Sequence, residues 1–368
     1  MRNQHLPITA VFLMFIFGFA LLDWVTPPQD VSEFERRDLA QFPVITLDRL
    51  LSGEATADYA TYMQDQAAFR DELRFFKSFI ERRGFLKKEN NGVYVAGDRI
   101  FDKFYGINHA LIERTAQRID EVVTDIDASP IYLAIIPTKA QMLDSSAYLL
   151  SDQYEIADTV AATVDATYID LMRLATPGNE DFYYITDPHW TTDGAISAYR
   201  RLAEAMGLES VTDYDFEVAT DSYIGSEYGR AAAWNIPKDT IYLAHNEILD
   251  GMSFCRFRTL DEADCYDSVY VELDDDTADR YDIFLGGLAP ITVITNDLAP
   301  EGSELVVFKD SYGHALAPFL AQHYRTVTLV DFRYIQRELV LENVNLDGAT
   351  ALFLYSTSVL NTDQRIVD

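Results

Sequence analysis

The distribution of hydrophobic and polar residues divides the chain into three parts. In the first, residues 6–22, only Thr9 is polar, and a helix of these 17 residues is roughly 25 Å long, the short end of a membrane span. Arg2 precedes the segment, which favours an N-terminus inside the cell and a body outside. We therefore predict a membrane anchor within residues 1–25 and a single-pass protein of the cell membrane with an extracytoplasmic main domain.

Two alternatives for this segment stay open. A cleaved signal peptide would make the protein secreted, although no convincing small-residue cleavage site follows the apolar run. A helix buried in a core is the other alternative.

The second part, residues 26–89, is predicted to be a stalk followed by helices. Thr26-Pro27-Pro28 ends the first helix, because proline cannot continue it. Between about residues 47 and 83, apolar positions recur at spacings of three and four, which is typical of amphipathic helices.

In the third part, residues 90–368, helical and strand patterns alternate. Residues 131–137 and 305–308 are continuous apolar runs, as expected for parallel strands covered on both faces, and residues 194–206 form a strongly amphipathic pattern. This alternation predicts an α/β fold, a three-layer α/β/α domain with a largely parallel sheet.

Composition and charge narrow the classes of function. The chain is 48% hydrophobic and 13% aromatic, which indicates a globular protein. It has 60 acidic and 29 basic residues, so its net charge is −31. Because such a surface repels phosphate backbones, we expect no binding to nucleic acid.

Two distant segments contain the candidate chemistry. Asp187 and His189 lie in one, and Ser311 lies between an apolar strand and a predicted helix in the other. A serine, a histidine and a carboxylate are the groups that serine-type acyl transfer needs. Ser311 is also placed where open α/β sheets bind ligands, beside a helix N-terminus whose N–H groups can stabilise an oxyanion.

Simpler interpretations exist for each segment taken alone. Asp310 or Ser311 has the character of a helix cap, and Asp187 that of a turn residue before Pro188. Asp187, His189 and Asp193 also form a weak set of metal ligands. We expect no metal and no cofactor.

Taken together, the segments resemble the DHHW family of bacterial extracytoplasmic proteins, which are similar to the SGNH-like O-acetylation proteins of alginate export. The similarity extends over nearly the whole chain and is carried by short segments in the same order: 34–43, 65–71, 90–94, 187–191, 284–287, 309–313, 317–320 and 331–334. The resemblance implies an SGNH-hydrolase-like, flavodoxin-like sheet with permuted motif order. It also implies Ser311 as nucleophile, His189 as base and Asp187 as the acid that orients the histidine.

Two departures from the family pattern affect the expected site. Pro188 replaces the first histidine of the family name, which suggests that this position has no chemical role. Leu288 follows Gly287 where an asparagine of the oxyanion hole is expected, and losing one such donor costs about 10²–10³ in rate. The remaining oxyanion candidates are the backbone of Ser311 and Gly287, with the Asn296 side chain as a replacement.

Other residues are assigned secondary roles. Arg333, Tyr312 and Trp190 are possible substrate contacts, although Arg333 is favoured to pair with a buried carboxylate. Cys255 and Cys265 either close a small disulfide loop or remain two free thiols.

The predicted function is acyl-ester chemistry on a cell-surface or secreted glycan, in the form of O-acetyl transfer. The resemblance implies a multi-spanning membrane acyltransferase as the partner that supplies the acetyl group. A carbohydrate acetylesterase with the same triad is one alternative. A non-catalytic glycan-binding surface protein is the other, and Leu288 favours it.

Overall fold

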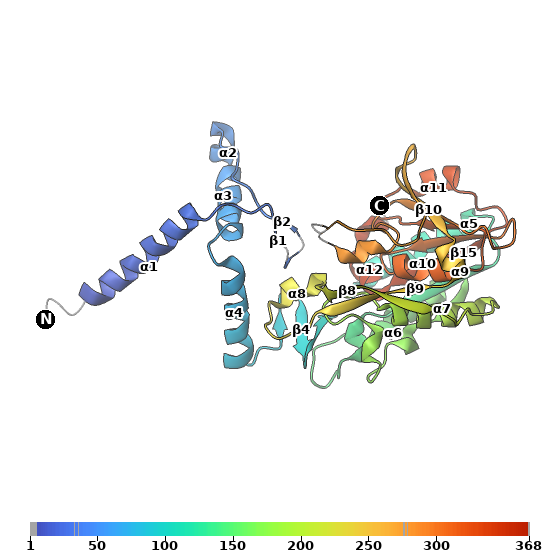
Figure 1. Cartoon of the computed structure of the whole chain (residues 1–368), viewed down its shortest axis with the longest axis horizontal. Helices are drawn as coiled ribbons and strands as arrows, with labels where there is room; N and C mark the ends of the chain where they lie inside the picture. Colours follow the sequence, from blue (N-terminus) through green and yellow to red (C-terminus); the bar gives the residue numbers. More distant parts are fainter. Residues whose placement is uncertain (1–5, 33, 36, 275–276, 278, 367–368) are drawn as a thin grey trace.

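The computed structural model describes residues 6–366, apart from residues 33, 36, 275, 276 and 278. Arg2, used above to orient the anchor, and Arg36, one of the matched family positions, lie outside the described residues. The first helix, α1 (Leu6–Val25), points away from the rest of the molecule in Figure 1. Within it, Pro7–Val25 is long and apolar enough to cross a membrane, and the rest of the described chain buries none of its side chains.

Three further helices form a column between α1 and the α/β body (Figure 1): α2 (Leu47–Ser52), α3 (Glu54–Asp65) and α4 (Arg70–Gly84). Thr46 caps α2 by accepting a hydrogen bond from the Arg49 N–H. The column is tied to the preceding strands β1 (Val31–Ser32) and β2 (Arg37–Asp38), because Arg37 donates two hydrogen bonds of 2.8 and 2.7 Å to Asp65.

The body is built on an eight-stranded sheet, and the predicted fold class is confirmed. In spatial order the strands are β11 (Glu262–Tyr266), β10 (Ser253–Thr259), β12 (Ile291–Thr295), β14 (Thr326–Val330), β13 (Glu304–Lys309), β15 (Thr350–Ser356), β6 (Ile131–Ile136) and β7 (Thr167–Asp170). From β14 to β7 all neighbours are parallel, whereas β12, β10 and β11 add an antiparallel edge. Cys255 and Cys265 face each other across β10 and β11 and form a disulfide.

Helices cover both faces of this sheet and enclose two hydrophobic cores. One face carries α5 (His109–Asp125), α6 (Gln153–Thr163), α11 (Arg337–Asn343) and α12 (Thr357–Thr362), and the other carries α7 (Thr192–Met206), α9 (Glu247–Asp250) and α10 (Gly313–Ala321). Successive residues of β13 point into opposite cores, Val306 and Phe308 into one and Leu305 and Val307 into the other. This explains why the four central residues of the strand, 305–308, are all apolar.

Smaller elements surround the sheet. They are β3 (Glu89–Asn90), β4 (Val93–Ala96), β5 (Arg99–Asp102), the antiparallel pair β8 (Asp215–Tyr223) and β9 (Asp239–His245), α8 (Ser226–Ala231), and single 3-10 turns at Lys139–Met142, Met172–Leu174, Glu180–Phe182, Arg280–Ile283 and Gln364–Ile366.

Candidate active site

Ser311 lies in the turn between β13 and α10, at the carboxyl edge of the parallel strands. The preceding residue, Asp310, is fully buried and holds the turn in place. Its Oδ1 accepts a hydrogen bond from the Tyr312 N–H at 3.0 Å, and its Oδ2 accepts one from the Ser356 N–H at 2.8 Å. Asp310 therefore links the serine turn to the end of the neighbouring strand β15.

A buried lysine, Lys309, packs against the serine turn on the side of Gly313. The stem of Lys309 passes so close to Gly313 that a Cβ there would lie 2.9 Å from three of its carbons. Its Nζ lies 2.6 Å from His314 Nε2 and 3.8 Å from Asp331. Burial lowers the pKa of Lys309 to about 8 and, together with the nearby charge of Lys309, lowers the pKa of His314 well below its ordinary value.

Asp187 and His189 lie in a tight turn that is closed by a bridge between Tyr183 and Trp190. Oδ1 of Asp187 lies 2.6 Å from His189 Nδ1 and also accepts a hydrogen bond from the His189 N–H at 3.1 Å. Its other oxygen, Oδ2, accepts hydrogen bonds from Ser226, from the N–H at 3.0 Å and from Oγ at 3.3 Å. The carboxylate is thus fixed on both oxygens.

The fold brings the two segments into contact. His189 Nε2 lies 2.7 Å from Ser311 Oγ, although 122 positions separate the two residues in the chain. The imidazole is stacked on Tyr281, with ring centroids 4.1 Å apart, and contacts Tyr312 on another side. The histidine side chain is 14% exposed, so the serine–histidine pair is reachable from solvent while the aspartate is buried.

A buried ion pair, Lys139 with Glu227, lies beneath the acid–histidine turn. Lys139 Nζ donates a 2.8 Å hydrogen bond to the Asp187 carbonyl, and burial raises the pKa of Glu227 to about 7 against the opposing charge of Lys139. Gly225 packs directly on the turn, since a Cβ there would lie 2.5 Å from the Thr186 carbonyl oxygen and 2.6 Å from Asp187 Cα.

Trp190 and Tyr312, two of the possible substrate contacts, are buried. Trp190 is 1% exposed and packs edge-on against Tyr312 at 5.1 Å, and the Tyr312 hydroxyl donates a 2.7 Å hydrogen bond to the Pro188 carbonyl. The structure therefore places both in the core, where they join the two segments, rather than on a surface that faces substrate.

The oxyanion candidates have different positions. Among the described residues, none accepts a hydrogen bond from the Ser311 N–H. Gly287 lies before β12 on the same edge of the sheet, and its N–H donates a 3.3 Å hydrogen bond to Phe284. Asn296 follows β12 at the opposite edge, where its amide binds the Ala321 carbonyl at 2.9 Å. The structure does not bring Asn296 to Ser311, and Leu288 is 52% exposed.

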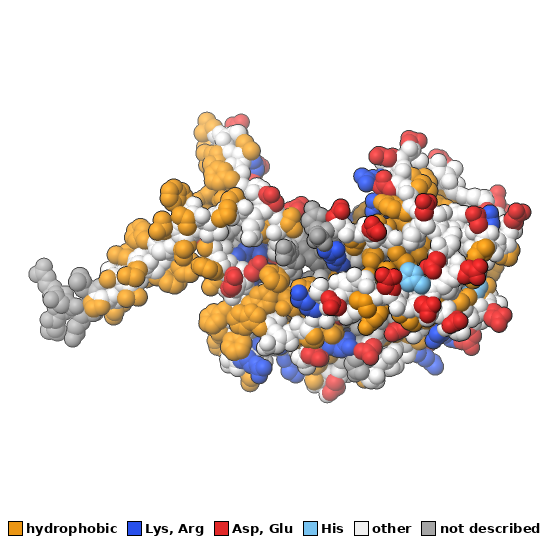
Figure 2. Space-filling view, in the orientation of Figure 1, with side chains coloured by type: hydrophobic (Ala, Val, Ile, Leu, Met, Phe, Trp, Pro, Cys, Tyr) orange, Lys and Arg blue, Asp and Glu red, His pale blue; other side chains and the backbone are white. Residues whose placement is uncertain are grey.

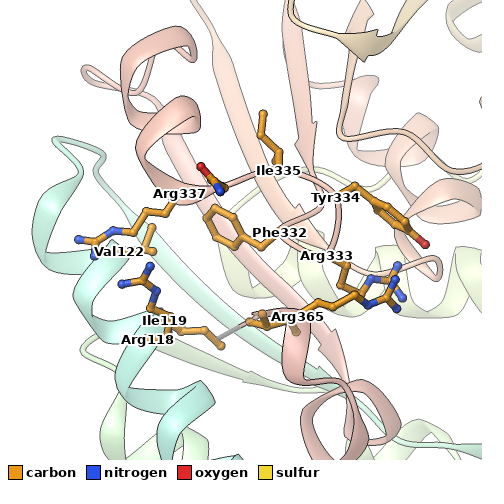
Figure 3. Close-up of a pocket in the computed structure, with 11 residues that line it drawn as sticks. Arg118, Ile119, Val122, Phe332, Arg333, Tyr334, Ile335, Arg337 and Arg365 are labelled. Carbon is orange, nitrogen blue, oxygen red and sulfur yellow. The ribbon is translucent and has the colours of Figure 1, made fainter. Parts of the chain in front are cut away.

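Arg333 is held by a carboxylate, in line with the favoured prediction. Its guanidinium donates hydrogen bonds of 2.8 and 2.6 Å to Asp331, which follows β14. Arg333 also lines a cavity of about 310 Å³, in which Figure 3 shows its side chain next to Arg365, with Tyr334 close by. The other polar side chains of the cavity wall include Arg118 and Arg337.

Several residues of the site carried no recognisable signal in the sequence. Ser226 and Glu227 begin the short helix α8 and Tyr281 lies in the 3-10 turn Arg280–Ile283, and only folding brings these short elements to Asp187 and His189. Lys139 is the exception, because a polar residue just after a buried apolar strand marks the ligand-binding edge of a sheet. Within the described residues, no group of three or more histidine, cysteine or acidic side chains is arranged to hold a metal ion.

Comparison with known proteins gives a family and a fold. The family model described as "DHHW protein" matches residues 83–330. A DHHW family protein from Eubacterium siraeum has 20% identity and a TM-score of 0.64, over 76% of this chain and 95% of that one. Bacillus cereus PatB1 has 19% identity and a TM-score of 0.59, over 74% and 98%.

A second structure of Bacillus cereus PatB1, described as carrying a sulfonyl adduct, has 17% identity and a TM-score of 0.56 over 74% of this chain and 98% of that one. Among curated proteins, none matches the chain.

Proposed function

The chain belongs to the DHHW protein family, and from this membership and the hydrogen-bonded serine, histidine and aspartate we propose that it performs acyl-ester chemistry on a cell-surface or secreted glycan, as an O-acetyltransferase. The observation that carries the proposal is the continuous contact from Asp187 through His189 to Ser311, at 2.6 and 2.7 Å. Acetyl as the transferred group follows from the sequence resemblance to O-acetylation proteins.

In the proposed mechanism, Ser311 Oγ attacks the carbonyl carbon of the acyl donor while His189 Nε2 accepts the Oγ proton. The tetrahedral intermediate collapses to an acyl-serine, and His189 returns the proton to the leaving oxygen. A sugar hydroxyl then attacks the acyl-serine carbonyl and gives its proton to His189, which passes this proton to Ser311 Oγ as the bond between Oγ and the acyl carbon breaks.

Asp187 keeps the imidazole in the tautomer that has its proton on Nδ1, so that Nε2 is free to accept. The contacts of Asp187 with Ser226 hold this carboxylate in place, and stacking on Tyr281 fixes the plane of the histidine ring. The N–H of Ser311 stabilises the negative charge on the carbonyl oxygen of the intermediate, and the N–H of Gly287 joins it after leaving its 3.3 Å hydrogen bond to Phe284.

We place the reaction outside the cell, with α1 as the anchor in the membrane. The glycan is then the acceptor, and a multi-spanning membrane acyltransferase supplies the acetyl group. Arg333, which lines the cavity of Figure 3, is the remaining candidate for a substrate contact.

The test uses the full-length chain in detergent, a chromogenic acetyl ester and an arylsulfonyl fluoride. We expect ester turnover and a single sulfonyl mass increment, mapped to Ser311, and the Ser311→Ala variant loses both. Ser52→Ala, at an exposed serine of α2, is the matched control and keeps both. Folded wild-type protein that shows neither reaction contradicts the proposal.

Two observations favour functions other than O-acetyl transfer. The partly exposed Ser311 and His189 are open to water, which favours an acetylesterase with the same triad. Neither of the two candidate positions supplies a side-chain amide to the oxyanion, because residue 288 is an exposed leucine and Asn296 lies at the opposite edge of the sheet, and this favours a non-catalytic glycan-binding protein. Adding oligosaccharide acceptors separates transfer from hydrolysis, because only a transferase gives an acetylated sugar.

A further inference from the structure

Helix α4 has an apolar stripe on its outer surface. Four large apolar side chains lie on this face and are 40–56% exposed: Phe69, which directly precedes the helix, and Leu73, Phe76 and Ile80 within it. Positions 69, 73, 76 and 80 follow the spacing of one helix face. Directly after the helix, Phe85 and Leu86 are exposed still further, so the apolar surface continues past its end.

The opposite face of α4 is fixed to the α/β body, so the stripe cannot turn inward. Phe75 is buried and stacks on Trp234, with ring centroids 5.9 Å apart. Ser78 Oγ donates a 2.9 Å hydrogen bond to the Ala231 carbonyl of α8. Because α4 already buries one face in this way, the stripe is a second apolar surface that has no partner among the described residues.

The stripe begins where α1 ends. The Ala68 N–H, in the turn before α4, donates a 2.7 Å hydrogen bond to Asp23 Oδ1 in the last turn of α1. Figure 1 shows the column of α2, α3 and α4 running across the end of α1. A bilayer that contains α1 would therefore have its surface at the level of α4.

The charge of this region differs from that of the rest of the chain. Residues 70–88 contain seven basic and three acidic residues, a net charge of +4 in a chain of −31. Figure 2 shows hydrophobic side chains gathered over α1 to α4 and acidic ones spread over the α/β body. A helix with phenylalanine and leucine on one side and lysine and arginine beside them is typical of segments that lie in the interface of an anionic membrane.

We propose that α4 lies in the headgroup region of the bilayer that α1 crosses, with Leu73, Phe76 and Ile80 inserted among the lipid chains. Lys77 and Arg83 lie beside this stripe and contact anionic headgroups. The body is then attached at two points, by the α1 span and by the α4 surface. Two attachments fix its orientation, because a single helix alone leaves the body free to tilt. The proposal does not depend on the chemistry at Ser311.

Spin labels test the proposal on the full-length chain in vesicles of phosphatidylcholine and phosphatidylglycerol. Single cysteines replace Phe76 in α4, Phe15 in α1 and Gln117, an exposed residue of α5 on the α/β body. Each nitroxide is measured for its accessibility to oxygen, which concentrates in lipid, and to a water-soluble nickel chelate. We expect the Phe76→Cys and Phe15→Cys labels to favour oxygen, and the Gln117→Cys label to favour nickel.

Three results would overturn the proposal. A label at position 76 that favours nickel as strongly as position 117 places the stripe in water. A label at position 76 that is shielded from both reagents places it against protein, a second copy or another partner. A label at position 15 that favours nickel shows that α1 lies in water and does not cross the bilayer, which the proposed arrangement requires. Far-UV circular dichroism of each labelled variant confirms that the helices are intact.

Discussion

The serine side of the site is assembled mainly within one short stretch of chain, whereas the acid–histidine side draws on four separate segments. Around Ser311, the strand, the turn and the helix follow one another, and Asp310 and Lys309 each make one contact within this stretch, to Tyr312 and His314, besides their contacts to Ser356 and Asp331. Around His189, support comes from Lys139, from the segment at Ser226 and from Tyr281. The nucleophile is therefore placed by local structure and the base by tertiary packing.

The two sides also differ in how burial affects their charged groups. Beneath the acid–histidine turn, burial raises the pKa of Glu227 to about 7. Beneath the serine turn, burial lowers the pKa of Lys309 to about 8. Both shifts favour the neutral form, but they act on groups of opposite charge, so the two sides should respond to pH in opposite directions.

The largest expected effect comes from removing the charge that orients the base. Asp187→Asn should lower kcat by on the order of 10³–10⁴-fold, because an amide can donate to His189 Nδ1 and stabilise the wrong tautomer. Turnover of the acetyl ester measures it. Asp193→Asn, at an exposed acid in the first turn of α7, is the matched control. An equal loss in that control would contradict the triad and favour the alternative in which Asp187, His189 and Asp193 hold a metal.

A second prediction compares the glycines that pack against the two sides. Gly225→Ala places a methyl group against the backbone of Asp187 and Thr186, which cannot move without displacing the carboxylate. We expect a loss of about 10²-fold in kcat, as for a misplacement of roughly 1 Å. For Gly313→Ala the three nearest atoms are carbons of the buried Lys309 side chain, at 2.9 Å, so the methyl group displaces that stem and not the backbone of Asp187, and the loss should stay below about tenfold.

Gly84→Ala controls for the added methyl group, because its Cβ would meet nothing closer than 3.8 Å. Equal losses of kcat in Gly225→Ala and Gly313→Ala would show that the serine side and the acid–histidine side tolerate an added methyl group equally well, which contradicts this prediction.

The smallest effect is on stability and depends on pH. Because the pKa of Glu227 is raised from 4.5 to about 7 in the folded state, folding takes up a proton between these values. The resulting stability is present below pH 4.5 and is lost as the pH rises through 7. Relative to Glu227→Gln, the wild type should lose at most about 3 kcal/mol of unfolding free energy across this window.

Lys309→Met gives the opposite sign. The pKa of Lys309 falls from 10.5 to about 8, so the folded state binds fewer protons between these values and wild-type stability rises with pH there. Urea denaturation at several pH values measures both differences. Parallel curves for the wild type and either variant would show that the group in question does not titrate as its burial implies.

The periodicity of the sequence accounts for much of the fold. The apolar run of α1, the amphipathic pattern of α7 and the unbroken apolar strands β6 and β13 follow directly from which surfaces each element must bury. The break at Gln66, between α3 and α4, is less visible in the sequence, because the helical pattern runs through it. It forms because Phe69 adopts a left-handed backbone conformation, with φ of 57°.

The candidate site also has features that the sequence predicts and features that it does not. The sequence by itself determined that Ser311 follows a buried strand and precedes a helix, because local hydrophobicity sets both elements. It also pointed to Asp187 and His189 through their spacing and the family resemblance. Only the tertiary structure decided that His189 reaches Ser311, that Ser226 and Tyr281 hold the base, and that Asn296 lies at the far edge of the sheet. The physical reason is range: helix and strand patterns depend on neighbours within a few residues, whereas a hydrogen bond across 122 positions depends on how the whole sheet is packed.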